Sequence, residues 1–466
     1  MTEKKEKPNI LIIMTDQHRA DMMTCAGRDE VPTPNIDRIA ENGIRFTNAY
    51  CPYPVCLASR SSFLTGLYAH NTGAINNNDR LDWRYRTMVH HFSDNDYLTG
   101  LIGKMHFNDV HNHGFEYYMS INDWLMYLGP DVYKYANEIA NHPLNQEHFY
   151  STMIDDGAGF PDVANLWEGS SPWVGQVEKF NFDSMSSEIE AEDHLDMFIA
   201  RETEKFLKRY QDQKFFLVAS FMKPHTPFFP PEEYAQKYPV EEMELPEIGD
   251  IEGYPEPVKN RIKWIQSNDD KLRKAHRAGY RGNLDFVDDC IGRVYDTLEE
   301  LGLMENTIVV YTSDHGEMDG DHGLYQKFCL FEPAVKVPLI VSYPDNLPEN
   351  EVTEALTEYM DLYPTLADLT DTSINTTINV DTFKAKDEID ASSFSEILYN
   401  PDKKDQDAIF SEYALRSETP RYMIREKRYK FIYNDNDQVI NELYDLKEDP
   451  GEEVNLILLP VWKFVK

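Results

Sequence analysis

Short apolar runs alternate along the chain with stretches whose apolar residues repeat at helical spacing. Four of the runs are bounded by polar, Gly or Pro residues and are rich in β-branched or aromatic side chains. They cover residues 9–15, 98–102, 215–221 and 308–311. This length and composition predict a buried strand for each run.

A helical pattern is clearest over residues 283–302. Its apolar positions on one face are Leu284, Val287, Ile291, Val294 and Leu298, and Gly302 follows as a stop signal. Strands that alternate with helices predict a mostly parallel sheet covered on both sides. We therefore predict an α/β fold with a large mixed, mostly parallel sheet sandwiched by helices.

The pattern changes after residue 371. A loop-like stretch over 372–392 precedes "RYMIREKRYKFIYNDNDQVINELYDL", which predicts two or three antiparallel strands with a turn near 434–437. We predict a catalytic domain over residues 1–375 and a small C-terminal antiparallel α+β subdomain over 376–466. The aromatic-rich residues 109–173 are predicted to form loops over the mouth of a site.

Composition narrows the classes of partner. The 466 residues include 82 acidic and 45 basic side chains, for a net charge of −37. Such a charge argues against nucleic acid or an anionic membrane as a partner. No apolar run approaches the ~20 residues of a spanning helix, so we expect no membrane partner. Association into a homo-oligomer stays open.

The N-terminus and the cysteines bear on location. "MTEKKEKPNILIIMTDQ" ends its short apolar stretch in Asp16, so it is more typical of a first strand than of a signal peptide. Five cysteines at irregular spacing indicate reduced thiols. We therefore expect a cytoplasmic protein.

The four predicted strands end in reactive groups. Asp16 and Gln17 follow the first, Lys104 and His106 the second, His225 the third, and Asp314 and His315 the fourth. Ligands of parallel sheets bind beyond the carboxyl ends of the strands, so we expect these groups to converge. Asp16, Asp314 and His315 suit a divalent cation, although an Asp after a strand also serves as a helix cap.

Cationic groups suggest what such a site would bind. Lys104, His106, His225 and Lys327 together with a metal would form a pocket for a tetrahedral oxyanion, although a single Lys or His is usually at the surface or in the core. Cys56 begins a predicted helix and is a candidate nucleophile. Arg60 lies one turn later on the same face.

Several of these segments resemble the type I sulfatases of the alkaline-phosphatase superfamily. "CLASRSSFLTG" is similar to their signature C-x-(P/A)-S-R-x-x-x-L-T-G. The resemblance continues through "PNILIIMTDQ", "GKMHF", "KPHTPF", "TSDHGEMDGDHGL" and "ELYDLKEDPGEEVNL" in the expected order. It implies an alkaline-phosphatase-like fold and a sulfuric-ester hydrolase.

The resemblance also implies roles. Cys56 would be oxidised to formylglycine, whose hydrate is the nucleophile and whose second hydroxyl allows sulfate to leave. The implied metal ligands are Asp16, Gln17, Cys56, Asp314 and His315. The other implied catalytic groups are Arg60, Lys104, His106, His225 and Lys327, with His225 or His106 as general acid. Asn77, Lys104, His225 and Lys327 would contact the sulfate.

Some positions depart from the commonest family pattern. Gln17 and His315 are closer to the choline-sulfatase and phosphonate monoester hydrolase branch, which moves the expected cation from Ca towards Mn or Mg. Ala58 replaces the commoner Pro, which fits a formylglycine-generating maturation enzyme of the anaerobic type.

Three functions stay open on this basis. The leading one is hydrolysis of a sulfated small molecule or saccharide, and the net charge mildly favours a small or cationic-headed ester. A phosphonate monoester or phosphodiester hydrolase is the alternative within the superfamily. A non-catalytic oxyanion-binding protein would result if Cys56 stays unmodified.

Overall fold

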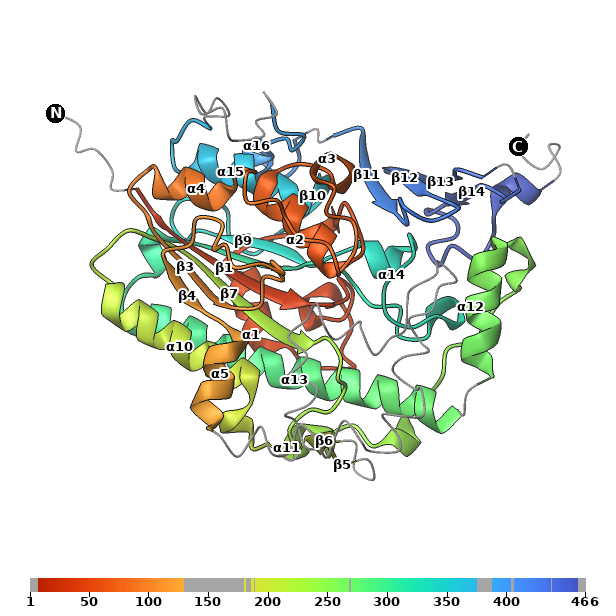
Figure 1. Ribbon diagram of the computed structural model, residues 1–466, viewed down its shortest axis with the longest axis horizontal. Coiled ribbons are helices and arrows are strands. Elements are labelled where there is room, and N and C mark those ends of the chain that lie inside the picture. The colour runs from red at the N-terminus through yellow and green to blue at the C-terminus, as the bar shows by residue number, and fades with distance from the viewer. Residues whose placement is uncertain are drawn as a thin grey trace.

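The structure is a computed structural model that describes residues 7–129, 180–181, 186–187, 189–267, 270–374, 388–403, 406–436 and 438–459. A large sheet forms its centre (Figure 1). In spatial order its strands are β10 (Glu351–Glu358), β2 (Gly43–Tyr50), β9 (Leu339–Ser342), β8 (Thr307–Ser313), β1 (Asn9–Asp16), β7 (Phe215–Pro224), β3 (Leu98–Gly103) and β4 (Tyr117–Met119). Only β9 is antiparallel to its neighbours, so the predicted α/β class with a mostly parallel sheet is confirmed.

Helices cover both faces of this sheet. The helices of the described residues are α1 (Pro34–Glu41), α2 (Cys56–Thr65), α3 (Ala69–Thr72), α4 (Met88–Ser93), α5 (Ile121–Leu128), α10 (Leu195–Tyr210), α11 (Glu232–Ala235), α12 (Glu256–Gln266), α13 (Asp270–Glu300), α14 (Glu332–Val335), α15 (Leu362–Leu369) and α16 (Ser395–Tyr399). Short 3-10 turns are η1 (Thr24–Ala26), η3 (Ala191–Asp193), η4 (Val240–Glu242), η5 (Ile251–Gly253), η6 (Met304–Asn306), η7 (Asp321–Gly323), η8 (Tyr359–Asp361) and η9 (Leu456–Leu458). A small pair, β5 (Phe180–Asn181) and β6 (Ser186–Ser187), lies outside the sheet.

Strand β1 shows why the sheet needs two helical layers. Ile10, Ile12 and Met14 join the apolar cluster that contains α2, α4 and α15, whereas Leu11 and Ile13 join the cluster that contains α1, α10 and α13. Side chains alternate between the two faces of a strand, and every residue of β1 is buried. A strand that is apolar on both faces is stable only when both faces are covered.

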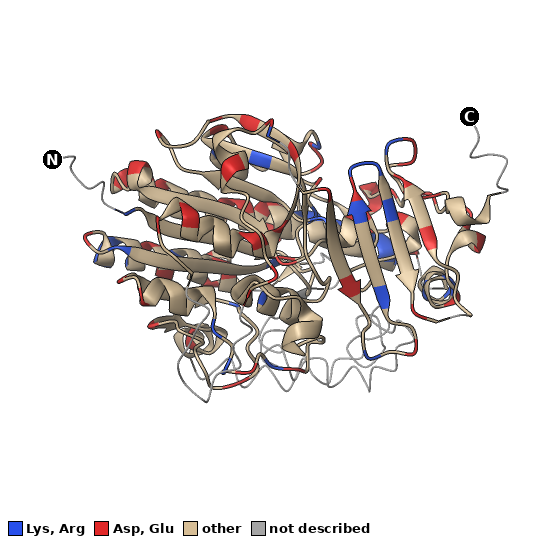
Figure 2. Ribbon diagram, turned by 90° about the horizontal axis from the view of Figure 1, so that it is seen from above, with Lys and Arg blue, Asp and Glu red and all other residues tan. Residues whose placement is uncertain are grey.

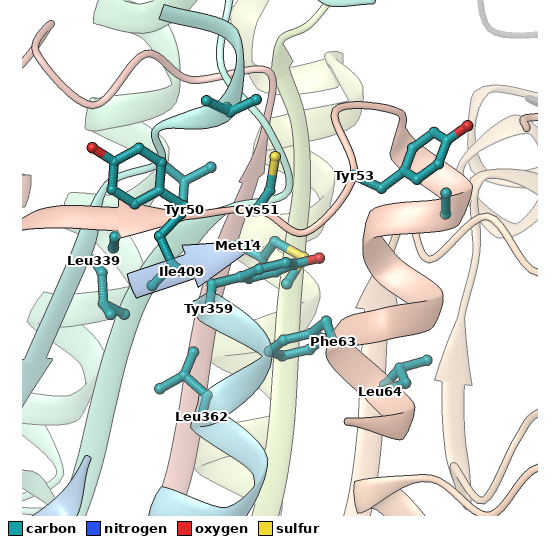
Figure 3. Packing of buried hydrophobic residues seen from close by; sticks show 14 of the residues in the cluster. Met14, Tyr50, Cys51, Tyr53, Phe63, Leu64, Leu339, Tyr359, Leu362 and Ile409 are labelled. Atoms are coloured by element: carbon teal, nitrogen blue, oxygen red, sulfur yellow. The ribbon is translucent and has the colours of Figure 1, made fainter. Parts of the chain in front are cut away.

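Aromatic packing holds helix α2 against Tyr359 of η8 (Figure 3). The Phe63 ring stacks on the Tyr359 ring, with centroids 5.3 Å apart and planes 10° apart. Ser59, one turn earlier, donates to the Asp314 carbonyl at 2.6 Å, and its Oγ lies 2.9 Å from the Tyr359 hydroxyl. These contacts hold the start of α2 against the end of β8.

A second, smaller sheet lies beside the first. Its antiparallel strands are β11 (Ala408–Tyr413), β12 (Arg421–Glu426), β13 (Tyr429–Asn434) and β14 (Glu442–Asp445). The segment predicted to form two or three antiparallel strands contains three, β12, β13 and β14, so this prediction is confirmed, and β11 precedes it as the fourth strand of the sheet. The predicted domain boundary at residue 375 lies outside the described residues and stays a prediction.

The predicted loops over 109–173 are partly wrong. The edge strand β4 and helix α5 occupy residues 117–128, and Trp124 of α5 is fully buried against the layer that contains α10. Ser120 and Asp123 form a capping box that starts α5, a signal that the loop prediction overlooked. Residues 130–173 lie outside the described part. Among the described helices, none is long and apolar enough to cross a membrane.

Candidate active site

The ends of β8, β1, β7 and β3 meet at one edge of the sheet. Thr15 lies opposite Ser313, Asp16 opposite Pro224, and Gly103 opposite Ser220. Because these strands are adjacent and parallel, the residues that follow them, Asp314, Lys104 and His225, meet Asp16 in one place. The expected convergence of the strand ends is what the structure has.

Cys56, the first residue of α2, lies next to these strand ends. Its Sγ lies 3.1 Å from the His315 Nε2 and 3.8 Å from the Asp16 Oδ1. Burial alone would raise the pKa of the Cys56 thiol, but Lys104, Lys327 and His315 hold it well below its usual value. These neighbours favour the thiolate form of Cys56, whose side chain is only 1% exposed.

Arg60 ties the two aspartates together. Its Nε donates to the Asp314 Oδ2 at 2.7 Å and its Nη2 to the Asp16 Oδ2 at 3.0 Å. Lys104 adds a second cation, with its Nζ 2.6 Å from the same Asp16 oxygen. Burial alone would raise the pKa of Asp16, and Cys56 would raise it further, but Lys104, His225 and Arg60 bring it well below its usual value.

The other oxygen of each aspartate, Oδ1, faces His315, and that of Asp314 also accepts from the Gln17 N–H at 3.1 Å. The Oδ1 of Asp16 lies 3.8 Å and that of Asp314 3.6 Å from the His315 Nε2. Because the His315 Nδ1 lies 3.0 Å from the Gly316 carbonyl, its Nε2 can present a lone pair. Ligand atoms of Asp16, Cys56, Asp314 and His315 all lie within 4.8 Å of one another. Buried carboxylates with one imidazole suit a divalent cation, so the donor set fits the expected metal.

Lys327 approaches from a separate loop and organises its neighbours. Its Nζ lies 2.7 Å from the Gln17 Oε1 and 2.8 Å from the His225 Nε2. An ammonium group only donates, so the His225 Nε2 accepts, and its Nδ1 donates to the Thr226 carbonyl at 2.7 Å. Burial, together with Lys327, lowers the pKa of His225 to about 4. In this arrangement the proton is on Lys327 and His225 is neutral.

The other expected residues are also placed near the nucleophile. The Asn77 Oδ1 accepts from the Leu57 N–H at 3.2 Å, so this side chain satisfies one of the free N–H groups at the buried start of α2. His106 lies beside Cys56, and burial lowers its pKa although Cys56 favours its charged form. Gln17 follows Asp16, but its amide is engaged by Lys327 and by Glu317, and its role as a metal ligand stays a prediction.

Sequence reasoning missed Glu317. Its Oε2 accepts from the Gln17 Nε2 at 2.5 Å, and its Oε1 accepts from the backbone N–H of Asp319 and of Gln326. Burial raises the pKa of Glu317 to about 7. The signal was available, because Glu317 closes the "SDHGE" segment, but a single Glu after a strand does not reveal which loop it will contact.

Comparison with family models gives two matches. Residues 8–372 match the model described as Sulfatase. Residues 320–465 match the model described as N-sulphoglucosamine sulphohydrolase, C-terminal. The first match spans most of the chain and includes each of the site residues described above.

Similar proteins agree with this assignment. The chain is 31% identical to an arylsulfatase of Clostridium perfringens, over 97% of this chain and 90% of that protein. It is 28% identical to a choline-sulfatase of Rhizobium meliloti, over 97% of this chain and 82% of that protein. In fold it is similar to the phosphonate monoester hydrolase of Agrobacterium radiobacter, with a TM-score of 0.75 and 21% sequence identity. The superposition covers 98% of this chain and 93% of that one.

Proposed function

The chain belongs to the sulfatase family and is a sulfuric-ester hydrolase, and we propose that residue 56, as formylglycine, carries its nucleophile. The observation that carries this proposal is the position of Cys56, at the start of α2 and 3.1 Å from His315. The hydrate of formylglycine supplies one hydroxyl that attacks sulfur as the alcohol leaves, and a second that loses its proton as the carbonyl re-forms and sulfate departs.

We propose that Asp16, Asp314 and His315, with residue 56, hold one divalent cation. A cation there would polarise the sulfuryl oxygens as a Lewis acid. The imidazole of His315 favours Mn over Ca, and Mg is the third candidate. Arg60 and Lys104 balance the two buried aspartates, so this pair of carboxylates is held at fixed geometry whether or not substrate is bound.

Lys327 and His225 would act on the leaving alcohol. The Lys327 Nζ lies 2.8 Å from the His225 Nε2, and the His225 Nδ1 is held by the Thr226 carbonyl, so the proton for the departing oxygen would be donated either by the Lys327 ammonium or by the His225 Nε2 after that nitrogen has taken it from Lys327. His106, beside Cys56, would face the same oxygen. Lys104 and Lys327 would also bind the sulfate charge, and Asn77 would contact the ester from the start of α2.

The substrate we propose is a sulfate ester of a small molecule or saccharide. The match of the C-terminal region to the N-sulphoglucosamine sulphohydrolase model supports a saccharide. Ala58 in the signature supports maturation by a formylglycine-generating enzyme of the anaerobic type.

The decisive experiment combines mass spectrometry with a substrate panel. We expect the peptide over residues 51–66 from protein made in a maturing host to carry an aldehyde or its hydrate at position 56. This protein should hydrolyse 4-nitrophenyl sulfate faster than phenyl phosphonate esters, and Cys56→Ala should lose at least about 1000-fold in kcat/KM. Faster turnover of the phosphonate esters would instead favour the phosphonate hydrolase, and an unmodified thiol without turnover would favour an oxyanion-binding protein.

Metal removal gives a separate prediction. Without a cation, the cationic groups within 3.0 Å of Asp16 and Asp314 in the described part of the chain are Arg60 and Lys104, so chelation should lower Tm as well as activity. We expect Mn, Mg or Ca, added singly at equal concentration, to restore Tm, and Asp314→Asn to remove this response. A Tm that is insensitive to chelator, in protein shown to be metal-free by elemental analysis, would contradict the metal site.

A further inference from the structure

The loop that carries Lys327 has an unusual backbone. The two residues that flank Lys327, Gln326 and Phe328, have φ of +62° and +72°. This left-handed region is common for glycine but sterically unfavourable for residues with a side chain. Two such residues beside a reactive group persist only where the surrounding structure holds them. The contacts of this loop with the rest of the chain therefore decide where Lys327 points.

Arg261 of α12 binds the backbone of this loop. Its Nη2 donates to the Tyr325 carbonyl at 2.6 Å and to the Lys327 carbonyl at 3.0 Å. Its Nη1 donates to the Phe328 carbonyl at 3.3 Å, and the guanidinium lies 5.8 Å from the centroid of the Phe328 ring. One side chain thus binds three carbonyls within the four residues that contain both left-handed positions.

Arg261 occupies a position of α12 that an apolar residue would usually fill. The buried residues of this helix lie on one face at helical spacing and are Val258, Arg261, Ile262 and Ile265. Arg261 is 5% exposed, and within the described residues it has no carboxylate partner and its Nε has no hydrogen-bond partner. A buried guanidinium without a counter-charge is costly. Its hydrogen bonds to the loop that carries Lys327 are what offset this cost.

The active site contacts the same loop through other groups. The Gln326 N–H donates to the Glu317 carboxylate, and the Lys327 Nζ lies 2.8 Å from the His225 Nε2. A rotation about φ on either side of Lys327 would turn its side chain relative to these partners. Loss of the Arg261 contacts should therefore let the backbone relax and move the Lys327 ammonium away from His225.

We propose that Arg261 is a positioning residue of the sulfatase reaction, which holds the left-handed backbone around Lys327 and so keeps the Lys327 ammonium against His225. The inference rests on the proposed role of Lys327 in hydrolysis, and it adds a residue that no sequence motif indicated. A guanidinium suits this task because its planar fork carries five N–H donors that reach several carbonyls at once. A lysine has its three donors on one nitrogen, so it could not bind all three carbonyls in the same way.

The test separates the hold on the loop from its effect on catalysis. Arg261→Met keeps the buried face of α12 apolar and filled, and Arg261→Lys keeps the charge and one donor nitrogen in case the first variant does not fold. Arg421→Met is the matched control, because Arg421 is 7% exposed but pairs with Glu442 in the C-terminal sheet. Hydrogen–deuterium exchange of the peptide over residues 317–331 reports on the loop and needs no turnover.

We expect exchange in this peptide to rise at least about fivefold in Arg261→Met and to stay unchanged in Arg421→Met. The kcat for 4-nitrophenyl sulfate should fall about 10- to 100-fold in Arg261→Met, with a smaller change in KM because Lys104 still binds the sulfate charge. In a Lys327→Ala background the same substitution should cost less than about twofold, and Arg261→Lys should keep part of the activity.

Unchanged exchange in folded Arg261→Met, or losses of kcat that simply multiply in the double variant, would overturn the inference. Absence of sulfate-ester turnover in the unaltered protein would overturn the proposed function, and with it the catalytic role of Arg261, whatever the exchange shows.

Discussion

At the scale of single residues, Glu317 shows how one buried carboxylate can orient a reactive group that it does not touch. The Lys327 ammonium only donates, so the Gln17 Oε1 must face Lys327 and the Gln17 Nε2 must face Glu317. Glu317 also accepts from the Gln326 N–H, next to Lys327. It therefore fixes both the loop and the amide between which the Lys327 ammonium is held, and we expect it to be a positioning residue.

A double-mutant cycle tests this expectation. Glu317→Gln should lower kcat about 10- to 100-fold with a smaller change in KM, because it disturbs a proton donor rather than the whole pocket. In a Lys327→Ala background the same substitution should cost less than about twofold. Glu442→Gln, an equally buried carboxylate in β14, is the control for general destabilisation. If the two losses simply multiply, Glu317 acts through the fold and not through Lys327.

At the scale of elements, a buried cluster joins α14 to the C-terminal sheet. Lys430 of β13 is fully buried, with its Nζ 3.2 Å from the Glu332 Oε1 and 2.7 Å from the Glu452 Oε1. Glu452 also accepts from the Glu332 N–H at 2.6 Å. Since one ammonium cannot fully neutralise two carboxylates, their pKa values separate. Burial raises the pKa of Glu452 to about 7, whereas Lys430, Lys336 and Arg425 overcome burial at Glu332 and lower its pKa to about 2.

This cluster predicts a pH dependence of stability. A Glu has its ordinary pKa of 4.5 in the unfolded chain, so between pH 4.5 and about 7 the folded state binds more protons at Glu452 than the unfolded state does. The free energy of unfolding therefore falls as pH rises through this window, by up to about 3 kcal/mol.

Glu452→Gln should remove that loss. The variant should gain stability relative to the unaltered protein as pH rises from 4.5 to 7, in denaturant titrations at several pH values. The exposed neighbour Glu453→Gln serves as control. A difference in unfolding free energy between Glu452→Gln and the unaltered protein that stays constant with pH would show that Glu452 ionises normally.

At the scale of the whole molecule, the dominant electrostatic feature is the net charge of −37. Asp and Glu residues occur on both sheets and on the helices around them (Figure 2). Like charges at this density repel one another and destabilise the compact state. Salt screens such repulsion, because the Debye length falls from about 30 Å at 0.01 M to about 8 Å at 0.15 M.

We therefore expect Tm to rise by a few degrees as NaCl increases over this range, with divalent cation held constant. Calorimetry in NaCl and in tetramethylammonium chloride would separate screening from specific ion binding, since both salts should act alike. A Tm that falls with salt would mean that the paired charges, such as Arg60 with Asp16 and Asp314, outweigh the general repulsion.

Much of the fold and of the site was predictable because its signals are local. The four predicted strands correspond to β1, β3, β7 and β8, and Gly302, with φ of +65°, ends the turn after α13 as expected. Adjacent parallel strands direct their ends to one edge of the sheet, so Asp16, Lys104, His225 and Asp314 could be assigned to one site before any coordinates. The signature around Cys56 then identified the chemistry.

Tertiary structure alone decided how these groups pair. Of three consecutive asparagines, Asn77 is the one that accepts from the Leu57 N–H, and the contact with Lys327 determines that the His225 Nε2 accepts a hydrogen bond. Glu317 contacts Gln17, which is distant in sequence, so its position in the site could not be predicted from local pattern. Periodicity and motifs determine which elements form and which residues reach the edge of the sheet. Hydrogen-bond polarity and the sharing of counter-charges depend on contacts between distant segments, so only the folded chain determines them.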